Sequence, residues 1–155
     1  MNHTPPPEIA ILALPEASAS TVYGMYDLFK SAGRDWSYVV EGRAGAPALA
    51  PVVVASTREP FALANGVRIV AERTFAECPA PAIACVPELV VPPGAPLGGR
   101  FDAAIDWLRR CHAAGATLAT ACSGALLLAE AGLLDGHEAT THWAYCDHLA
   151  RAYPR

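Results

Sequence analysis

Short apolar runs alternate along this chain with longer segments of helical spacing. The runs that are predicted as strands cover residues 8–14, 51–55, 83–91 and 117–121. The segments that are predicted as helices cover residues 18–32, 101–114, 123–131 and 143–153. Strands that are joined through helices lie parallel in a sheet. The alternation therefore predicts an α/β fold, with a mostly parallel sheet and helices on both of its faces.

Three further segments are predicted to be extended. Trp36–Val40 and Glu138–Thr141 are interpreted as short strands. Val67–Val70 follows Asn65-Gly66, a pair that is typical of a tight turn, and is interpreted as the returning strand of a hairpin. No long linker divides the chain, so its 155 residues are expected to form one domain.

The composition excludes several classes of protein. Apolar residues make up 53% of the chain and charged residues 17%, which suits a packed core and not a disordered chain. The net charge of −4 offers no basic surface to DNA, so DNA binding is expected only through a module that this chain lacks. No signal peptide or membrane-spanning run is recognisable, and the five cysteines form no C-x-x-C pair. These features predict a cytoplasmic protein with free thiols and no membrane contact.

Cys122 is the strongest candidate for a reactive residue. It lies in Ala119-Thr-Ala-Cys-Ser-Gly, between a predicted strand and a predicted helix, and its neighbours are small. A nucleophile elbow needs this arrangement because its tight turn has room only for small residues. Unpaired N–H groups at the start of the following helix would favour the thiolate. The alternative is a buried structural cysteine.

His142 is the candidate partner of Cys122. It follows the predicted strand 138–141, and strand ends at one edge of a parallel sheet converge, so its imidazole could accept the thiol proton. A structural histidine beside Trp143 is the alternative. His142, Cys146 and His148 have a spacing that permits a metal site, but a helix surface explains them better, and no metal is predicted. No cofactor is expected either, because the chain contains no G-x-G-x-x-G or P-loop motif.

Three stretches of the chain carry a family resemblance. They are Cys122-Ser-Gly-Ala-Leu-Leu-Leu-Ala-Glu-Ala-Gly-Leu-Leu-Asp-Gly, then Ala-Thr-Thr-His142-Trp, and Leu149-Ala-Arg-Ala-Tyr-Pro. Together they resemble the ThiJ/PfpI family of class I glutamine-amidotransferase-like proteins. More narrowly, the chain is similar to the amidase-like N-terminal domain of GlxA-type, AraC-family transcriptional regulators. The resemblance implies a flavodoxin-like, doubly wound fold, a homodimer, and Cys122 and His142 as nucleophile and partner.

The chain departs from the family pattern at two places that matter for catalysis. Thr21 occupies the position where the enzymes carry an acidic residue, and Glu16, the nearest carboxylate, precedes that position. The family's Pro-Gly-Gly loop reads here Val91-Pro-Pro-Gly94, and Pro93 has no N–H to donate. The expected donors to an oxyanion are therefore Gly94 and the N–H of Ser123. These departures predict a poor hydrolase.

The leading prediction is a ligand-sensing regulatory domain of a transcription factor. Its small-molecule pocket is expected around five residues: Thr21, Gly94, Cys122, Ser123 and His142. The alternatives are a free-standing cysteine-dependent amidase, hydratase or glyoxalase-like enzyme, and a structural dimerisation domain. Domains of the family continue beyond the position of Tyr153-Pro154, so the chain is expected to be C-terminally truncated, with its helix-turn-helix module outside this sequence.

Overall fold

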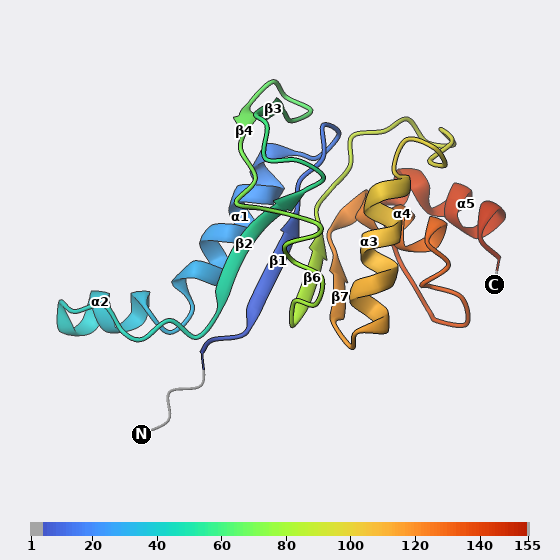
Figure 1. Cartoon of the computed structure of the whole chain (residues 1–155). Helices are drawn as coiled ribbons and strands as arrows, with labels where there is room; N and C mark the ends of the chain where they lie inside the picture. Colours follow the sequence, from blue (N-terminus) through green and yellow to red (C-terminus); the bar gives the residue numbers. More distant parts are fainter. Residues whose placement is uncertain (1–4, 155) are drawn as a thin grey trace.

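A five-stranded sheet forms the centre of the molecule (Figure 1). The computed structural model describes residues 5–154. The strands of the sheet are β1 (Glu8–Leu12), β2 (Ala50–Ala55), β5 (Arg73–Thr74), β6 (Ile83–Val86) and β7 (Thr117–Thr120). They are ordered β5-β2-β1-β6-β7, and all their pairings are parallel. The predicted α/β fold is confirmed.

The helices around the sheet show where its winding reverses. They are α1 (Ala19–Ser31), α2 (Asp35–Glu41), α3 (Asp102–Ala113), α4 (Ala125–Glu130) and α5 (Trp143–Ala152). The connection through α1 leads outward from β1 to β2, whereas α3 leads from β6 in the opposite direction to β7. Because such crossovers are right-handed, α1 and α3 lie on opposite faces of the sheet. Ligands of doubly wound sheets bind beyond the carboxyl ends of the strands at such a reversal, here between β1 and β6.

The core is built around β1 and α3. Ile9, Ile11 and Leu12 of β1 are completely buried, as expected for a central strand with both faces covered. Trp107 of α3 is also fully buried and stacks on Phe75 with the ring centroids 5.1 Å apart. The Trp107 indole N–H donates a hydrogen bond of 2.7 Å to the carbonyl of Cys78, so burying this ring leaves no unpaired donor.

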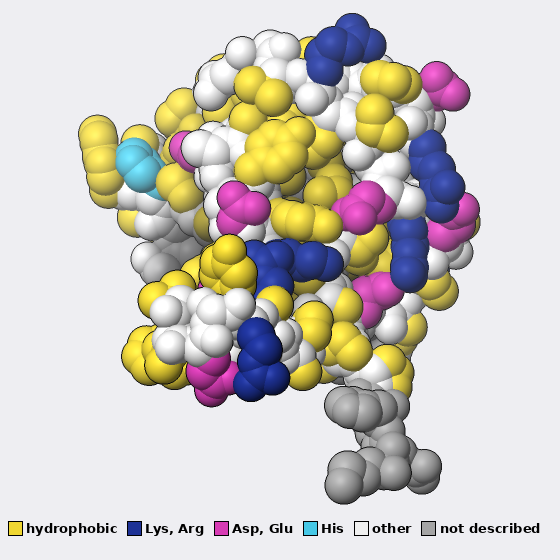
Figure 2. Space-filling model, turned by 90° about the vertical axis from the view of Figure 1, so that its left-hand side faces the viewer, with side chains coloured by type: hydrophobic (Ala, Val, Ile, Leu, Met, Phe, Trp, Pro, Cys, Tyr) yellow, Lys and Arg dark blue, Asp and Glu magenta, His cyan; other side chains and the backbone are white. Residues whose placement is uncertain are grey.

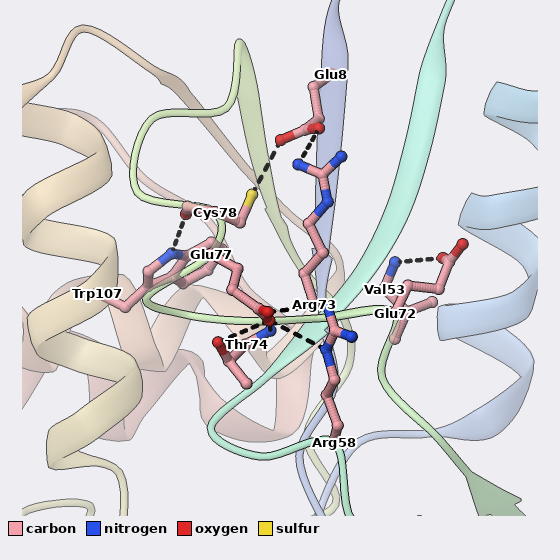
Figure 3. A network of polar contacts seen from close by, with 9 residues as sticks. All are labelled: Glu8, Val53, Arg58, Glu72, Arg73, Thr74, Glu77, Cys78 and Trp107. Atoms are coloured by element: carbon pink, nitrogen blue, oxygen red, sulfur yellow. Dashed lines mark hydrogen bonds and ion pairs between the residues drawn. The ribbon is translucent and has the colours of Figure 1, made fainter.

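A polar network closes the amino-terminal edge of the sheet (Figure 3). Glu8, the first residue of β1, accepts a hydrogen bond from the Cys78 thiol at 3.1 Å and pairs with Arg73 of β5 at 2.7 Å. Burial raises the pKa of Cys78 to about 12, and the neighbouring Glu8 carboxylate adds to the shift. Cys78 is therefore a protonated structural thiol at the edge opposite to Cys122, which follows the carboxyl end of β7.

The predicted strand Trp36–Val40 is wrong, because these residues belong to helix α2. The aromatic and β-branched residues of this segment favour a strand only where another strand is available for pairing. The segment lies away from the sheet (Figure 1), so the helix satisfies its backbone groups locally. Gly42 ends the helix with a left-handed φ of 70°.

Two other predicted strands need correction, whereas the hairpin is confirmed. The strand of residues 83–91 ends at Val86, and Glu138–Thr141 has no regular secondary structure. Strand β3 (Phe61–Ala62) pairs antiparallel with β4 (Arg68–Ile69) around Gly66, as Asn65-Gly66 predicts. Among the described residues, no helix has both the length and the apolar character needed to cross a membrane.

Candidate functional site

Cys122 occupies a strained turn between β7 and α4. Its φ of 55° is positive, and it is the one non-glycine residue with positive φ in the described part of the chain. Left-handed conformations are unfavourable for residues with a side chain and cluster at functional sites. The N–H of Ala121 donates to Val86 O at 2.9 Å, so the sheet ladder holds the chain up to the turn. The Cys122 side chain itself is exposed, which excludes the alternative of a buried structural cysteine.

Ser123 and Gly124 fix this turn to the end of β6. The Ser123 hydroxyl donates to Leu89 O at 2.7 Å and accepts from Leu89 N–H at 2.9 Å, and the residue is almost fully buried. Gly124 approaches the backbone so closely that a Cβ would lie 2.6 Å from Pro87 O and 2.8 Å from Val86 O. The predicted ligand residue Ser123 therefore has a side chain with a structural role, and only its backbone remains for a ligand.

The segment that follows β1 meets the same edge of the sheet. Ala17 forms an antiparallel bridge with Leu89, and the N–H of Val90 donates to Glu16 O at 2.7 Å. Residues that follow β1, β6 and β7 are thus brought together, as the strand topology requires. Thr21 lies half-buried in the first turn of α1. Glu16 is buried, and its carboxylate pairs with the guanidinium of Arg100, so this carboxylate is already neutralised.

His142 adjoins the turn through its neighbour Thr141. The Thr141 hydroxyl donates to the carbonyl oxygen of Cys122 at 3.1 Å. His142 is the N-cap of α5, and its Nδ1 accepts a hydrogen bond from the Ala144 N–H at 3.2 Å. Within residues 5–154, no hydrogen bond joins the His142 ring to the Cys122 thiol. The bond to Ala144 assigns the proton of the neutral ring to Nε2, which leaves no nitrogen free to accept another.

Tyr145 is a residue of this site that the sequence analysis missed. Its hydroxyl donates a hydrogen bond of 2.6 Å to Val91 O, in the loop after β6. Burial raises the pKa of Tyr145, and negative charge at Cys122 and Glu88 raises it further. The phenol thus shares the electrostatic environment of the Cys122 thiol. Tyr145 follows His142 by three residues in the sequence, and residues at this spacing are neighbours on one helix face. This spacing could have predicted Tyr145 as a site residue.

The glycine loop lies beside α5. Pro92–Ala95 forms a turn in which the N–H of Ala95 donates to Pro92 O at 3.0 Å. Gly94 has a φ of 82°, which matches the third position of a type II turn, where glycine is favoured. A Cβ at Gly94 would lie 3.9 Å from Nδ1 of His148. Gly94 therefore faces α5, on the side of the site that carries Tyr145.

A hollow of about 330 Å³ lies beyond Thr141. It is bounded by α4, the loop before α5, and α5 itself, and Cys146 opens into it. Cys122 and His142 are not among the residues that line it. In the described part of the chain, no three His, Cys, Asp or Glu side chains are grouped as a metal site requires.

The comparison with known proteins identifies the family of this chain. The fold and the turn define an α/β protein with a cysteine at the carboxyl edge of its sheet. Residues 8–154 match the model of the DJ-1/PfpI family. The chain belongs to the DJ-1/PfpI family, which confirms the resemblance to ThiJ/PfpI proteins.

Relatives with two kinds of description are similar to parts of the chain. The isonitrile hydratase of Pseudomonas putida is 36% identical over 92 residues, which are 58% of this chain and 38% of that protein. The HTH-type transcriptional regulator CdhR of Pseudomonas aeruginosa is 43% identical over 60 residues, which are 39% of this chain and 18% of the regulator. The chain thus spans less than half the length of these relatives.

Solved structures confirm the fold over nearly the whole chain. A ThiJ/PfpI family protein from Pseudomonas syringae has a TM-score of 0.71 and 25% identity, over 94% of this chain and 54% of that one. An AraC family transcriptional regulator from Pseudomonas putida has a TM-score of 0.72 and 18% identity, over 96% of this chain and 74% of the regulator.

Proposed function

We propose that this chain is the ligand-sensing domain of an AraC-family transcriptional regulator. Its small-molecule site would lie at the carboxyl edge of the sheet, around Cys122. Thr21, Gly94 and His142 surround that edge in the proposal, together with the Ser123 backbone and the Tyr145 hydroxyl. A DNA-binding module outside this chain would read the promoter. The regulators among the related proteins and structures support this assignment.

The observation that carries the proposal is the hydrogen bond between Ala144 N–H and His142 Nδ1. Activation of a thiol requires a neighbouring group that can accept its proton. Nδ1 is engaged as a helix cap, and Nε2 already holds the proton of the neutral ring. The carboxylate of Glu16 is paired with Arg100, and Thr21 has no acid–base capacity near neutral pH. An exposed thiol whose neighbouring histidine is engaged as a helix cap suits binding better than turnover.

A cysteine-dependent hydrolase or hydratase is the second candidate. It is favoured by the strained, exposed Cys122 and by the likeness to an isonitrile hydratase. In such an enzyme, the thiolate would attack an electrophilic carbon of the substrate and form a covalent intermediate. The thiol proton would then have to be accepted by a group other than the His142 ring, which caps helix α5.

Turnover and binding assays distinguish these two functions. We expect small amides, isonitriles and methylglyoxal to show no hydrolysis or hydration that depends on Cys122, because the His142 ring is engaged as a helix cap and Pro93 has no N–H to donate. The loss of one oxyanion donor alone costs about a hundredfold or more in rate. The same compounds are tested for saturable increases in melting temperature. Steady turnover by the wild type that disappears in Cys122→Ala would contradict the sensing role.

We expect this chain not to bind DNA by itself. Its net charge is −4, and α5, the most plausible reading helix, contains Asp147 and a single arginine, Arg151. Affinity for the phosphate backbone comes from many Lys and Arg contacts and is strongest at low salt. A gel shift with mixed duplex DNA at low ionic strength should therefore show no complex at micromolar protein. A complex under these conditions would mean that this domain itself touches the promoter.

A further inference from the structure

Glu88 is an acidic residue at the carboxyl edge of the sheet, beside the turn that holds Cys122. It lies two residues after the end of β6, and its side chain is half-buried. In residues 5–154, the Glu88 carboxylate forms no hydrogen bond and no ion pair. Partial removal of a charge from water is unfavourable unless an opposite charge or a hydrogen-bond donor compensates for it. The carboxylate is therefore available to a ligand that supplies this compensation.

The backbone around Glu88 is held from two directions. Its carbonyl oxygen accepts a hydrogen bond of 3.0 Å from the N–H of Ser18, which precedes α1. The next residue, Leu89, forms two hydrogen bonds with the Ser123 hydroxyl. Glu88 thus lies at the reversal between β1 and β6, next to the residues that position Cys122. A side chain on such a preformed framework loses less conformational entropy when a ligand binds.

Tyr145 places an aromatic ring near both Glu88 and the thiol. Its hydroxyl donates to Val91 O at 2.6 Å, which holds the ring beside the segment that contains Glu88. Burial raises the pKa of Tyr145, and negative charge at Cys122 and at Glu88 raises it further, so both groups act on this hydroxyl. The His142 ring lies edge-on to Tyr145, with the ring centroids 6.1 Å apart. Aromatic rings attract cations to their faces.

The charge of Glu88 is not balanced by the rest of the site. The site is built from four segments that follow β1, β6 and β7 or lead into α5: residues 13–18, 87–101, 121–124 and 141–145. Together they contain two acidic residues, Glu16 and Glu88, and one basic residue, Arg100, which is paired with Glu16. Exposed Lys and Arg side chains occur on other surfaces, such as the side of α1 and α2 that Figure 2 shows. The site therefore has a negative potential, which favours cations.

We propose that the site at Cys122 takes small molecules with a cationic nitrogen, which the Glu88 carboxylate binds beside the Tyr145 ring. This inference rests on the proposed function, because it names the ligand class of the same site. A carboxylate accepts a charge-assisted hydrogen bond from an ammonium or guanidinium N–H, and an aromatic ring adds a cation–π contact. Anionic molecules of the same size would be repelled by the unbalanced charge of Glu88.

Charged reagents that modify thiols test this selectivity. In Cys146→Ser, Cys122 is the one exposed cysteine of the described residues. Its modification rate is measured with the cationic trimethylammonium-ethyl methanethiosulfonate and with the anionic sulfonato-ethyl analogue, and each rate is divided by that of the neutral thiol β-mercaptoethanol. One charge several ångströms away changes the local concentration of an ion by roughly three- to tenfold at low salt, in opposite directions for the two reagents. We therefore expect the cationic reagent to be preferred by at least about tenfold.

Glu88→Gln in this background should reduce the preference by about tenfold, because it keeps the size of the side chain and removes its charge. Glu88→Asp retains the charge and should keep most of the preference. Glu41→Gln is the matched control: Glu41 is exposed at the end of α2, away from the sheet (Figure 1), so the loss of its charge should leave the ratio of the two rates unchanged. Circular dichroism spectra like that of the wild type show that the variants are folded.

Equal normalised rates for the two reagents would overturn the proposal, and so would a preference that persists in Glu88→Gln. Failure of the proposed function is a different result. Steady turnover that depends on Cys122 would show an enzyme in place of a sensor. The ratio of the two modification rates would still report the charge that the site selects.

Discussion

Limited treatment with iodoacetamide at neutral pH is expected to modify Cys122 before any other thiol. Burial raises the pKa of Cys78 to about 12, and that of Cys85 and Cys111 to about 11. Their thiolate fraction near pH 7 is therefore on the order of 10⁻⁴ or less, and the thiolate is the nucleophile. Cys122 is exposed at its strained turn and should react on the order of a hundredfold faster than these three, since burial raises their pKa about two units or more above that of an ordinary thiol.

Cys146 is the informative competitor because it is also exposed. Its thiol is directed at the carbonyl oxygens of His142 and Thr141, at 3.7 and 3.9 Å, and these contacts must break before it reacts. Peptide mass mapping over time measures each site separately. Cys146→Ser should leave the fastest labelling phase unchanged, whereas Cys122→Ser should remove it. If Cys146 or Cys78 is modified first, the interpretation of Cys122 as the reactive residue is wrong.

Gly124→Ala is expected to destabilise the fold by about 2–3 kcal/mol, the upper part of the range for overpacked sites. The new Cβ would lie 2.6 Å from Pro87 O and 2.8 Å from Val86 O. These atoms belong to the backbone at the end of β6, which cannot move without disturbing the sheet. In a chain of this size, the melting temperature should fall by roughly 5–10 °C.

Gly24→Ala is the matched control, because Gly24 lies in α1 and an added Cβ would meet nothing within 4 Å beyond its chain neighbours and the backbone of its own helix. Alanine in a helix is favoured over glycine by up to about 1 kcal/mol, so this variant should be as stable as the wild type or more stable. Chemical denaturation of both variants gives the comparison. Equal stability of Gly124→Ala and the wild type would show that the turn is not packed against β6 in the way described.

The contacts that stabilise the turn at Cys122 also position the thiol of the proposed ligand site. Strain at a left-handed cysteine persists only where the surroundings enforce it. Here the enforcing contacts are the Ser123 hydroxyl on Leu89 and the close approach of Gly124 to β6. The same contacts hold the thiol at the carboxyl edge of the sheet, where ligands of such folds bind. A ligand at Cys122 would therefore meet a preformed site.

Local sequence patterns were sufficient for most elements. The apolar run at residues 8–14 predicted β1, and the helical spacing of residues 101–114 predicted α3, because both signals depend on near neighbours in the chain. The small residues around Cys122 likewise predicted a strand-to-helix turn. Local pattern failed at Trp36–Val40, where the same residue types suit a strand or an exposed helix. Only the presence or absence of a partner strand decides between these structures.

By itself, the sequence determined the class of fold, the family and the cysteine at the turn, since periodicity and motif are carried by neighbouring residues. The tertiary structure decided which residues surround that cysteine. Tyr145 was placed beside it by the packing of α5, and Glu16 was neutralised by Arg100, which lies far along the chain. The proton of His142 was assigned to Nε2 by the backbone geometry at the start of α5. These features depend on contacts between distant segments or on hydrogen-bond geometry, which spacing along the sequence does not encode.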